Sequence, residues 1–456
     1  MKTIFKLTLS AALLGLASCG KMLEMTPPSA IVAPNFWKTA GDAEAGLMNA
    51  YNFMQNPMWQ NFVTVPLVLA DDVRANSGGN FTRHEAFVAT PVHGNVQDVW
   101  RETYFAVHAA NDVLANVPAI NDPALQKDRV MGEAYFIRGW AFYQLTLLFG
   151  KIPLPLQPSK SSGADFNLKR SEVAEVYQQI FKDLLEAEKL LPATQPNRAR
   201  AAKASARAWL AKAYLQQPQP NYTLALAECE EIMADAQYRL LPGASFGDIF
   251  AVGKQNSAET IFELSFRPST ATEGHGLDGE FVPYQGAGFR VRPHPKIIDA
   301  FAASTGDLRA PVTIGIHNNN RYIKKYEQAP PTTTNRGTQA ANVVFLRLAD
   351  IVLLRAECLN ELNRTAEAIP FLNQIRSRAG LPPTTAATKA DLKLAIENER
   401  FLELAFEPHR WYDLIRWNKA VGTVPNLTEA NRARILWPVP SRELDLNPNL
   451  DQNPSY

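Results

Sequence analysis

The sequence predicts a mainly α-helical protein in which amphipathic helix pairs form an α-superhelical scaffold. One side is expected to be irregular, loop-rich and to contain short β-strands. Three observations lead to this prediction: apolar residues recur at helical spacing through most of the chain, one helix pair is repeated, and two long stretches lack that spacing. The 456 residues are 46% hydrophobic and 20% charged, which is ample for a core. A formal net charge of +1 gives no indication of nucleic-acid binding.

The helical segments are bounded by capping residues, glycines and prolines. Ser171 provides a cap signal at the start of one helix, and Gly150 with Pro153 beyond it marks the end of another. A further stop is expected at Pro408, between a long helix and a second, aromatic-rich one. The predicted helices cover residues 36–54, 100–117, 126–149, 171–191, 203–216, 223–235, 345–360, 366–378 and 390–406.

One of these helix pairs is repeated. The segment Leu210–Leu215 aligns with Leu353–Cys358, and in the same register Ala225 falls on Ala368. Small residues at these points allow two antiparallel helices to approach closely. The pattern resembles a tetratricopeptide (TPR) helix pair; two generic amphipathic hairpins are the alternative interpretation.

Residues 55–98 and 236–342 break the helical pattern and contain short β-like runs among Gly, Pro and Asn. Aromatic and basic side chains are scattered through both stretches. Aromatic faces can stack on sugar rings or peptide side chains, and nearby arginines can donate hydrogen bonds. Local packing as a small core is the alternative. The candidate ligand-binding residues are Trp59, Phe81, Arg83, His84 and Phe87 in the first stretch, and Phe281, Tyr284, Phe289, Arg290 and Arg292 in the second.

The N-terminus indicates export. Lys2 and Lys6 precede an apolar stretch that is too short to span a bilayer as a helix. This stretch ends in Leu-Ala-Ser before Cys19, which resembles a bacterial lipobox. The resemblance implies a signal peptide over residues 1–18 and lipidation of Cys19; a chance cysteine is the alternative.

The two remaining cysteines, Cys229 and Cys358, lie in helical stretches without metal-ligand spacing. We expect buried free thiols, with a disulfide between them as the alternative. His84 and His93 share a loop, but the seven histidines show no metal-binding pattern. The glycines of Gly274–Gly279 match a dinucleotide-binding spacing without its strand and helix context. The sequence therefore predicts no metal site and no cofactor.

Three glutamates in the C-terminal half suggest a possible enzyme site. They recur at every fourth position, so they line one face of a helix and require basic partners. A glycosidase needs two carboxyl groups on opposite sides of a sugar bond, whereas these stand on one helix face. We therefore predict a structural brace and no catalytic residues. The glutamates are Glu399, Glu403 and Glu407, and the expected partners are Arg400, Arg410 and Arg416.

Four sequence blocks, in order, resemble the SusD/RagB family of bacterial surface lipoproteins. They are Trp100-x3-Tyr104 with the run GEAYFIRGWAFYQLTLLFGKIPL, then FLRLADIVLLRAECLNEL, then ENERFLELAFEPHRWYDLIRW, and finally LWPVPSRELDLNPNLDQNPSY. The resemblance covers nearly the whole chain. Pro408 and Ser455 stand where the family usually has glycine, so local turn geometry is expected to differ there.

The resemblance implies a function as well as a fold. Family members are not enzymes; they sit on the outer membrane by their lipid and bind oligosaccharides, or peptides in the RagB branch. They pass the ligand to a SusC-like, TonB-dependent transporter. We expect an N-terminal region over residues 19–235 and a C-terminal region over 236–456 that form one fold, with the irregular side facing the ligand. A TPR-type scaffold without a nutrient ligand remains the alternative.

Overall fold

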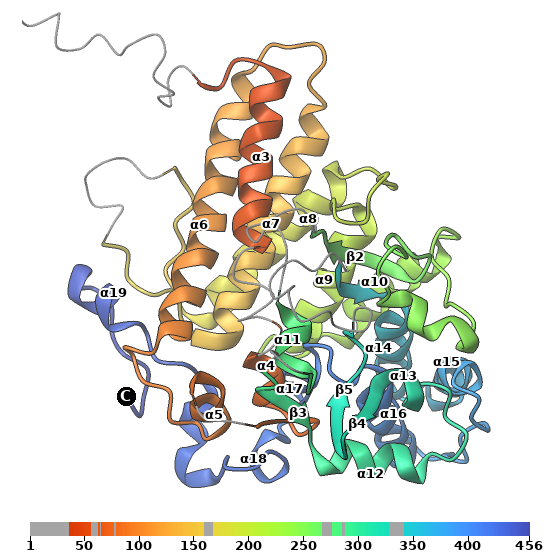
Figure 1. The fold of residues 1–456 in the computed structure, drawn as a ribbon. Helices are drawn as coiled ribbons and strands as arrows, with labels where there is room; N and C mark the ends of the chain where they lie inside the picture. Colours follow the sequence, from red (N-terminus) through yellow and green to blue (C-terminus); the bar gives the residue numbers. More distant parts are fainter. Residues whose placement is uncertain are drawn as a thin grey trace, which may run out of the picture.

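A curved row of long helices runs through the molecule, as the computed structural model shows (Figure 1). The structure describes residues 36–55, 63, 65–76, 79–158, 167–266, 276–284, 288–327 and 342–456. The helices of the row are α3 (Ala40–Gln55), α6 (Gly94–Asn116), α7 (Lys127–Phe149), α8 (Val173–Leu190), α9 (Lys203–Gln216), α10 (Tyr222–Ala234), α14 (Leu348–Glu361), α15 (Thr365–Arg378) and α16 (Lys389–Glu403). Each packs on the next, and both α15 and α16 pack on α14.

The repeated helix pair is confirmed, and with it the TPR-like fold class. Helices α9 and α10 form one pair, and α14 and α15 form the other. Four small residues at the aligned positions are fully buried, namely Ala213, Ala225, Ala356 and Ala368. Helix α10 packs directly on α14, although residues 236–342 separate them in sequence. The irregular stretch therefore leaves the helical row and returns to it without interrupting the stacking.

The C-terminal tail is hydrogen-bonded to the end of α7. Gly150 ends the helix with a φ of 72°, a conformation that glycine adopts without strain. The backbone N–H of Trp437 donates to the Leu148 carbonyl oxygen at 2.7 Å, and the Asn453 side chain donates to that of Phe149 at 2.8 Å. These bonds satisfy helix-terminal carbonyl groups with groups from the tail.

Short elements make up the irregular side. Three antiparallel strand pairs are present among the described residues: β1 with β3, β2 with β6, and β4 with β5. The strands are β1 (Val73–Ala75), β2 (Thr260–Leu264), β3 (Val291–Pro293), β4 (Ile314–His317), β5 (Asn320–Ile323) and β6 (Val343–Arg347). The short helices are α4 (Val65–Val68), α5 (Asn80–Glu85), α11 (Leu277–Phe281), α12 (Pro295–Ala303), α13 (Ala310–Thr313), α17 (Arg410–Arg416), α18 (Ala420–Thr423) and α19 (Ser441–Leu446), with 3-10 turns η2 (Val117–Ala119), η4 (Gly243–Ile249) and η5 (Glu429–Ile435).

The structure corrects three local predictions. The helix expected from Phe345 begins only at Leu348, because the buried run Val343–Arg347 pairs with β2 as a strand. The helix expected to stop at Pro408 ends at Glu403, and Phe406 then adopts a φ of 65°. Ser171 does not cap α8; its N–H donates to the Ile152 carbonyl oxygen, and Glu172 precedes the helix instead.

The main hydrophobic core is continuous between the two halves of the chain and contains buried residues from Ala43 to Val439. Both cysteines that the structure describes, Cys229 and Cys358, are buried and free, as predicted. The division into residues 19–235 and 236–456 stays a prediction, and the signal peptide (1–18) and Cys19 lie outside the described residues.

Candidate ligand-binding site

The two irregular stretches that hold the candidate residues meet in space. Strands β1 and β3 pair with Val73 opposite Pro293. Beyond the strands, the Asn76 backbone N–H donates to the Arg290 carbonyl oxygen at 2.7 Å, and the Asn76 side chain donates to that of Phe289 at 2.9 Å. Residues early in the chain and residues near its middle therefore border one surface.

The candidates of the first stretch are mostly core residues. Phe81, His84 and Phe87 expose only 5%, 1% and 4% of their surface. Phe87 packs on Trp411, and His84 packs on Trp437, with ring centroids 5.7 and 4.7 Å apart. Buried rings offer no face to a ligand, which corrects the expectation for these three side chains: they support the loop from within.

The other two candidates of that stretch, Arg83 and Trp59, are not core residues of the described structure. Arg83 is exposed on α5 and has no ion-pair partner among the described residues. Trp59 lies outside the described residues.

His84 and His93 contact each other with ring centroids 4.7 Å apart, and burial lowers the pKa of His84 to about 3, so this imidazole is neutral. No group of three or more His, Cys, Asp or Glu side chains in the described part of the chain is arranged to hold a metal ion.

The candidates of the second stretch are more accessible. Phe281 is fully buried, but Tyr284, Phe289 and Arg292 are half-buried and Arg290 is exposed. The Arg290 guanidinium donates to Glu280 at 2.8 Å. Phe289 has a φ of 43°, so the chain turns sharply just before β3.

Tyr284 is the centre of a polar aromatic group. Its hydroxyl lies 3.0 Å from that of Tyr322, and both hydroxyls donate to the Glu327 carboxylate. The His317 ring stands edge-on to Tyr284 with centroids 4.9 Å apart. Burial and the neighbouring carboxylate raise the pKa of Tyr284, so the hydroxyl stays protonated. We call Tyr284, His317, Tyr322 and Glu327 the Tyr284 cluster.

A glycine in the β4–β5 hairpin makes this arrangement possible. Gly315 lies directly opposite Tyr322, and a Cβ atom at Gly315 would come within 2.3 Å of the Tyr322 ring. The ring therefore lies across the glycine backbone, where a larger residue would displace it. Strand β5 also packs on β3, so the Tyr284 cluster is next to the surface formed by β1 and β3.

The glutamate ladder has the buried, structural character that the sequence predicts. Glu399, Glu403 and Glu407 expose at most 1% of their surface. Burial alone would raise the pKa of Glu407, but Arg347 and Lys325 outweigh burial and lower it to about 2. Arg378, Arg347 and Arg309 likewise hold the pKa of Glu403 well below its usual range. Glu403 and Glu407 are therefore ionised, whereas burial outweighs Arg309 at Glu399 and raises its pKa. All three carboxyl groups are inaccessible, which does not suit a general acid.

The predicted partners of this ladder were wrong. Arg400 pairs with Asp350 and Asp413, Arg410 with Asp71, and Arg416 with Glu357 and Asp413. The actual partners come from distant segments: Arg309 donates to Glu399 at 2.7 Å and to Glu403 at 3.0 Å. We call this buried group the ionic centre; it consists of Glu259, Glu399, Glu403 and Glu407 with Arg309, Lys325, Arg347 and Arg378.

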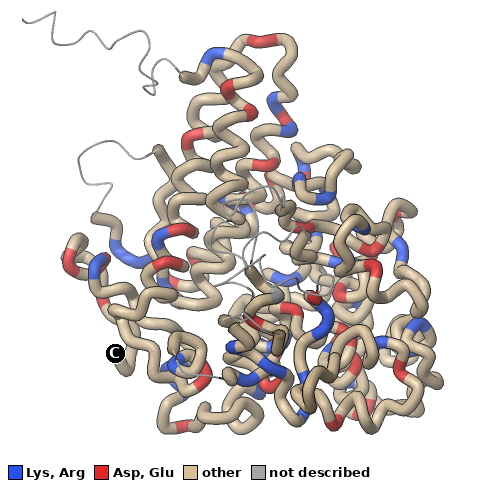
Figure 2. The backbone as a smooth tube through the Cα atoms, in the orientation of Figure 1, with Lys and Arg blue, Asp and Glu red and all other residues tan. Residues whose placement is uncertain are grey.

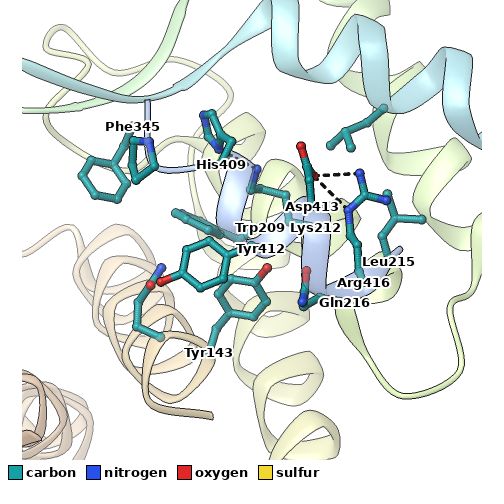
Figure 3. Close-up of a pocket in the computed structure, with 13 residues that line it drawn as sticks. Tyr143, Trp209, Lys212, Leu215, Gln216, Phe345, His409, Tyr412, Asp413 and Arg416 are labelled. Atoms are coloured by element: carbon teal, nitrogen blue, oxygen red, sulfur yellow. Dashed lines mark hydrogen bonds and ion pairs between the residues drawn. The ribbon is translucent and has the colours of Figure 1, made fainter. Parts of the chain in front are cut away.

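A cavity beside α17 is enclosed by aromatic rings (Figure 3). Tyr143, Trp209 and Tyr412 line it, together with Lys212 and His409. Lys212 lies 2.8 Å from Asp350 and 3.2 Å from the His409 ring. The volume is about 30 Å³, enough for a water molecule or two and far below the few hundred Å³ of a small-molecule site. This cavity is therefore too small to hold a sugar ring.

These features define a helical-repeat protein with a loop-built surface where two distant stretches meet. Residues 305–427 match a family model described as the SusD family, and residues 23–215 match one described as "Starch-binding associating with outer membrane". The chain belongs to the SusD family.

Relatives agree with this assignment, and solved structures share the fold. SusD-like protein P2 from Formosa agariphila is 29% identical over 99% of both chains, and a SusD-like protein from Bacteroides ovatus is 23% identical over 91% of this chain and 83% of the relative. A SusD superfamily protein from Bacteroides vulgatus has a TM-score of 0.82 at 23% identity, covering 92% of this chain and 100% of that chain. A "Laminarin binding SusD-like protein" has a TM-score of 0.81 at 24% identity with the same coverage. No helix among the described residues is long and apolar enough to cross a membrane.

Sequence reasoning missed several residues of this surface. Tyr322, His317 and Glu327 were not among the candidates, and neither was Arg74, which lies opposite Arg292. Tyr322 follows an Asn-rich turn, a hairpin signal that could have placed it opposite Gly315. Nothing local to Arg74 indicates that β1 pairs with β3.

Proposed function

We propose that this chain is a surface-exposed outer-membrane lipoprotein, anchored through Cys19, that binds oligosaccharides without altering them. It delivers them to a SusC-like, TonB-dependent transporter. Membership of the SusD family supports this proposal, as do the description of the matched family and the fold shared with a laminarin-binding protein. The lipobox-like sequence before Cys19 supports the anchor.

The observation that carries the binding proposal is the Tyr284 cluster. It joins a half-buried aromatic ring to hydroxyl and carboxylate groups at the junction of two distant stretches. A ring face can stack on a sugar, while the polar groups accept and donate hydrogen bonds to its hydroxyls. The hydrogen bond to Glu327 and the contact with the Tyr322 ring hold the Tyr284 ring in one orientation, which reduces the entropy lost on binding.

Glycan and peptide microarrays probed with the purified chain, starting at residue 20, test the ligand class. We expect binding to oligosaccharides. Binding to peptides alone would favour oligopeptide capture, and binding to neither would favour a protein-interaction scaffold. For any glycan identified, Tyr284→Ala should lower the affinity roughly tenfold by isothermal titration calorimetry, because one lost aromatic contact costs about 1–2 kcal/mol.

Two control variants make this test specific. Tyr284→Phe keeps the ring and should retain more affinity than Tyr284→Ala, and Tyr222→Ala removes a half-buried tyrosine on α10, away from the cluster. Equal affinity of Tyr284→Ala and the parent chain would contradict the proposed role. For the anchor, Cys19→Ala should release the protein from the membrane fraction, and the parent chain should co-purify with the transporter in detergent.

A further inference from the structure

Two arginines stand side by side on the outer face of the β1–β3 pair. Arg74 and Arg292 are directly opposite each other in the antiparallel register. Residues opposite each other in such a pair point to the same face of the sheet. The flanking residues Val73 and Val291 point to the other face and are buried, with 1% and 0% of their surface exposed. Both guanidinium groups therefore lie on the side away from the core, where they are half-buried.

These two guanidinium groups lack a carboxylate partner among the described residues. Neither forms an ion pair there, and the Nε atom of each is buried without a hydrogen-bond partner. The Glu85 carboxylate acts electrostatically on both arginines, and it accepts from the Ala75 backbone N–H at 3.3 Å. Burial and the neighbouring Arg74 lower the pKa of Arg292. The pair thus carries an excess of positive charge.

The surroundings do not neutralise this excess. Besides Glu85, two acids of this region are already paired: Glu280 with Arg290, and Asp71 with Arg410 and Lys296. In Figure 2, Lys and Arg gather around the place that β3 occupies in Figure 1. Because β3 packs on β5, the arginines are close to the Tyr284 cluster.

Like charges directly opposite each other in a β-ladder destabilise it. The planar donor fork of arginine matches a carboxylate or sulfate group, and two forks can hold one such group from two sides. We propose that Arg74 and Arg292 bind an anionic oxygen group, the carboxylate of a uronic acid or a sulfate ester, on the oligosaccharide held at the Tyr284 cluster. This inference rests on the proposed function and makes its ligand an acidic glycan.

Matched pairs of ligands that differ only in charge test the proposal. We would titrate trigalacturonic acid against its fully methyl-esterified form, and a sulfated galactan oligosaccharide against its desulfated form, by calorimetry. The charged member of at least one pair should bind more tightly, and the pair affected distinguishes carboxylate from sulfate. Arg74→Gln and Arg292→Gln should each lower that affinity roughly 10- to 100-fold and leave the neutral member unaffected.

Control variants separate the site from general charge effects. Arg442→Gln removes the same charge from exposed α19 and should leave the affinity unchanged. Glu85→Gln removes the competing acid and should increase it. Equal binding of charged and neutral members, or equal losses in Arg74→Gln and Arg442→Gln, would overturn the anion site while the glycan-binding function stands.

A second measurement needs no oligosaccharide. Sulfate should raise the melting temperature more than chloride at equal ionic strength, and this increment should be about 1–2 °C smaller in Arg74→Gln and Arg292→Gln than in the parent chain or Arg442→Gln. If no glycan binds but this difference is present, the anion site stands and the glycan function fails. If the increment is the same in all four proteins and no charged ligand is preferred, the anion site is refuted.

Discussion

The ionic centre and the β1–β3 face both contain arginines, but among the described residues these are paired with carboxylates in the first and unpaired in the second. In the ionic centre, Arg309 contacts Asp307, Glu399 and Glu403, and it exposes none of its surface. On the β1–β3 face, Arg74 and Arg292 lie opposite each other and form no ion pair in the described part of the chain. A buried charge without a partner is strongly destabilising, whereas a half-buried one is tolerated. Pairing thus distinguishes arginines that hold the fold from arginines available to a ligand.

Two neighbouring aspartates connect these regions. Asp71 pairs with Arg410 of α17 and with Lys296 of α12. Asp72 accepts from the Phe406 backbone N–H at 3.0 Å, and its own carbonyl oxygen accepts from the His294 N–H at 2.8 Å. These bonds attach the segment that holds Phe406 and Arg410 to β1. The β1–β3 pair is therefore anchored to the chain that follows Glu403 of the ionic centre.

The largest expected effect comes from breaking the ionic centre. Glu403→Ala leaves Arg309, Arg347 and Arg378 facing a gap in a region without solvent, which should lower the free energy of unfolding by about 3–5 kcal/mol. Urea denaturation at pH 7 measures this loss. Glu367→Ala, in an exposed pair with Arg364, serves as the control and should produce no measurable change. An unchanged melting temperature in Glu403→Ala would contradict the structural role.

A smaller effect on stability is expected from replacing Asp71 or Asp72 by asparagine, and at pH 8 the two changes should have opposite signs. Burial raises the pKa of Asp72 to about 7 from its usual 3.8, so the folded protein favours the protonated carboxyl group. This stabilising contribution is complete below pH 3.8 and is lost as the pH rises through about 7. Asp72→Asn mimics the protonated form and keeps an oxygen for the Phe406 N–H. It should therefore stabilise the fold at pH 8, by at most about 4 kcal/mol, and have little effect at pH 4.

The matched variant Asp71→Asn should do the reverse. Although burial alone would raise the pKa of Asp71, Arg410 and Lys296 outweigh it and lower the pKa. The stabilisation from this carboxylate is present above its usual pKa of 3.8 and is lost as the pH falls through the lower folded-state value. Asp71→Asn should therefore lose about 1–3 kcal/mol at pH 8. Urea titrations of both variants at pH 4 and pH 8 test the pair; changes of equal sign at pH 8 would refute it.

The sequence predicts the helices well because their signal is local. Apolar spacing and end residues identify α9 without error, and Ala225 and Ala368 reveal the repeat. The strand at Val343–Arg347 is missed because a short apolar run fits a strand and a helix equally well. The partners of Glu399 and Glu403 are missed for another reason: Arg309 is 90 and 94 residues away, so only the tertiary fold brings it near.

The candidate surface could be predicted by region but not by residue. Tyr284 and Arg292 are recognisable as aromatic and basic groups in a loop, whereas the burial of Phe81 depends on packing that composition does not encode. Arg74 becomes relevant only through the register of β1 and β3, which joins segments more than two hundred residues apart in sequence. Long-range pairing of such short strands leaves no pattern in a single sequence.

The smallest expected effect is that of Arg→Gln on the β1–β3 face, and it tests the comparison with the ionic centre most directly. The same substitution should lower stability in the ionic centre but not on the β1–β3 face. In a chloride buffer, Arg74→Gln relieves the repulsion between opposed guanidinium groups and should leave stability unchanged or raise it by about 0.2–1 kcal/mol. Arg309→Gln removes a paired charge from the ionic centre and should destabilise the fold by about 3–5 kcal/mol. Urea titrations of both variants decide the matter. A large loss in Arg74→Gln would show that Arg74 has a structural partner, and the division between fold-holding and ligand-facing arginines would then fail.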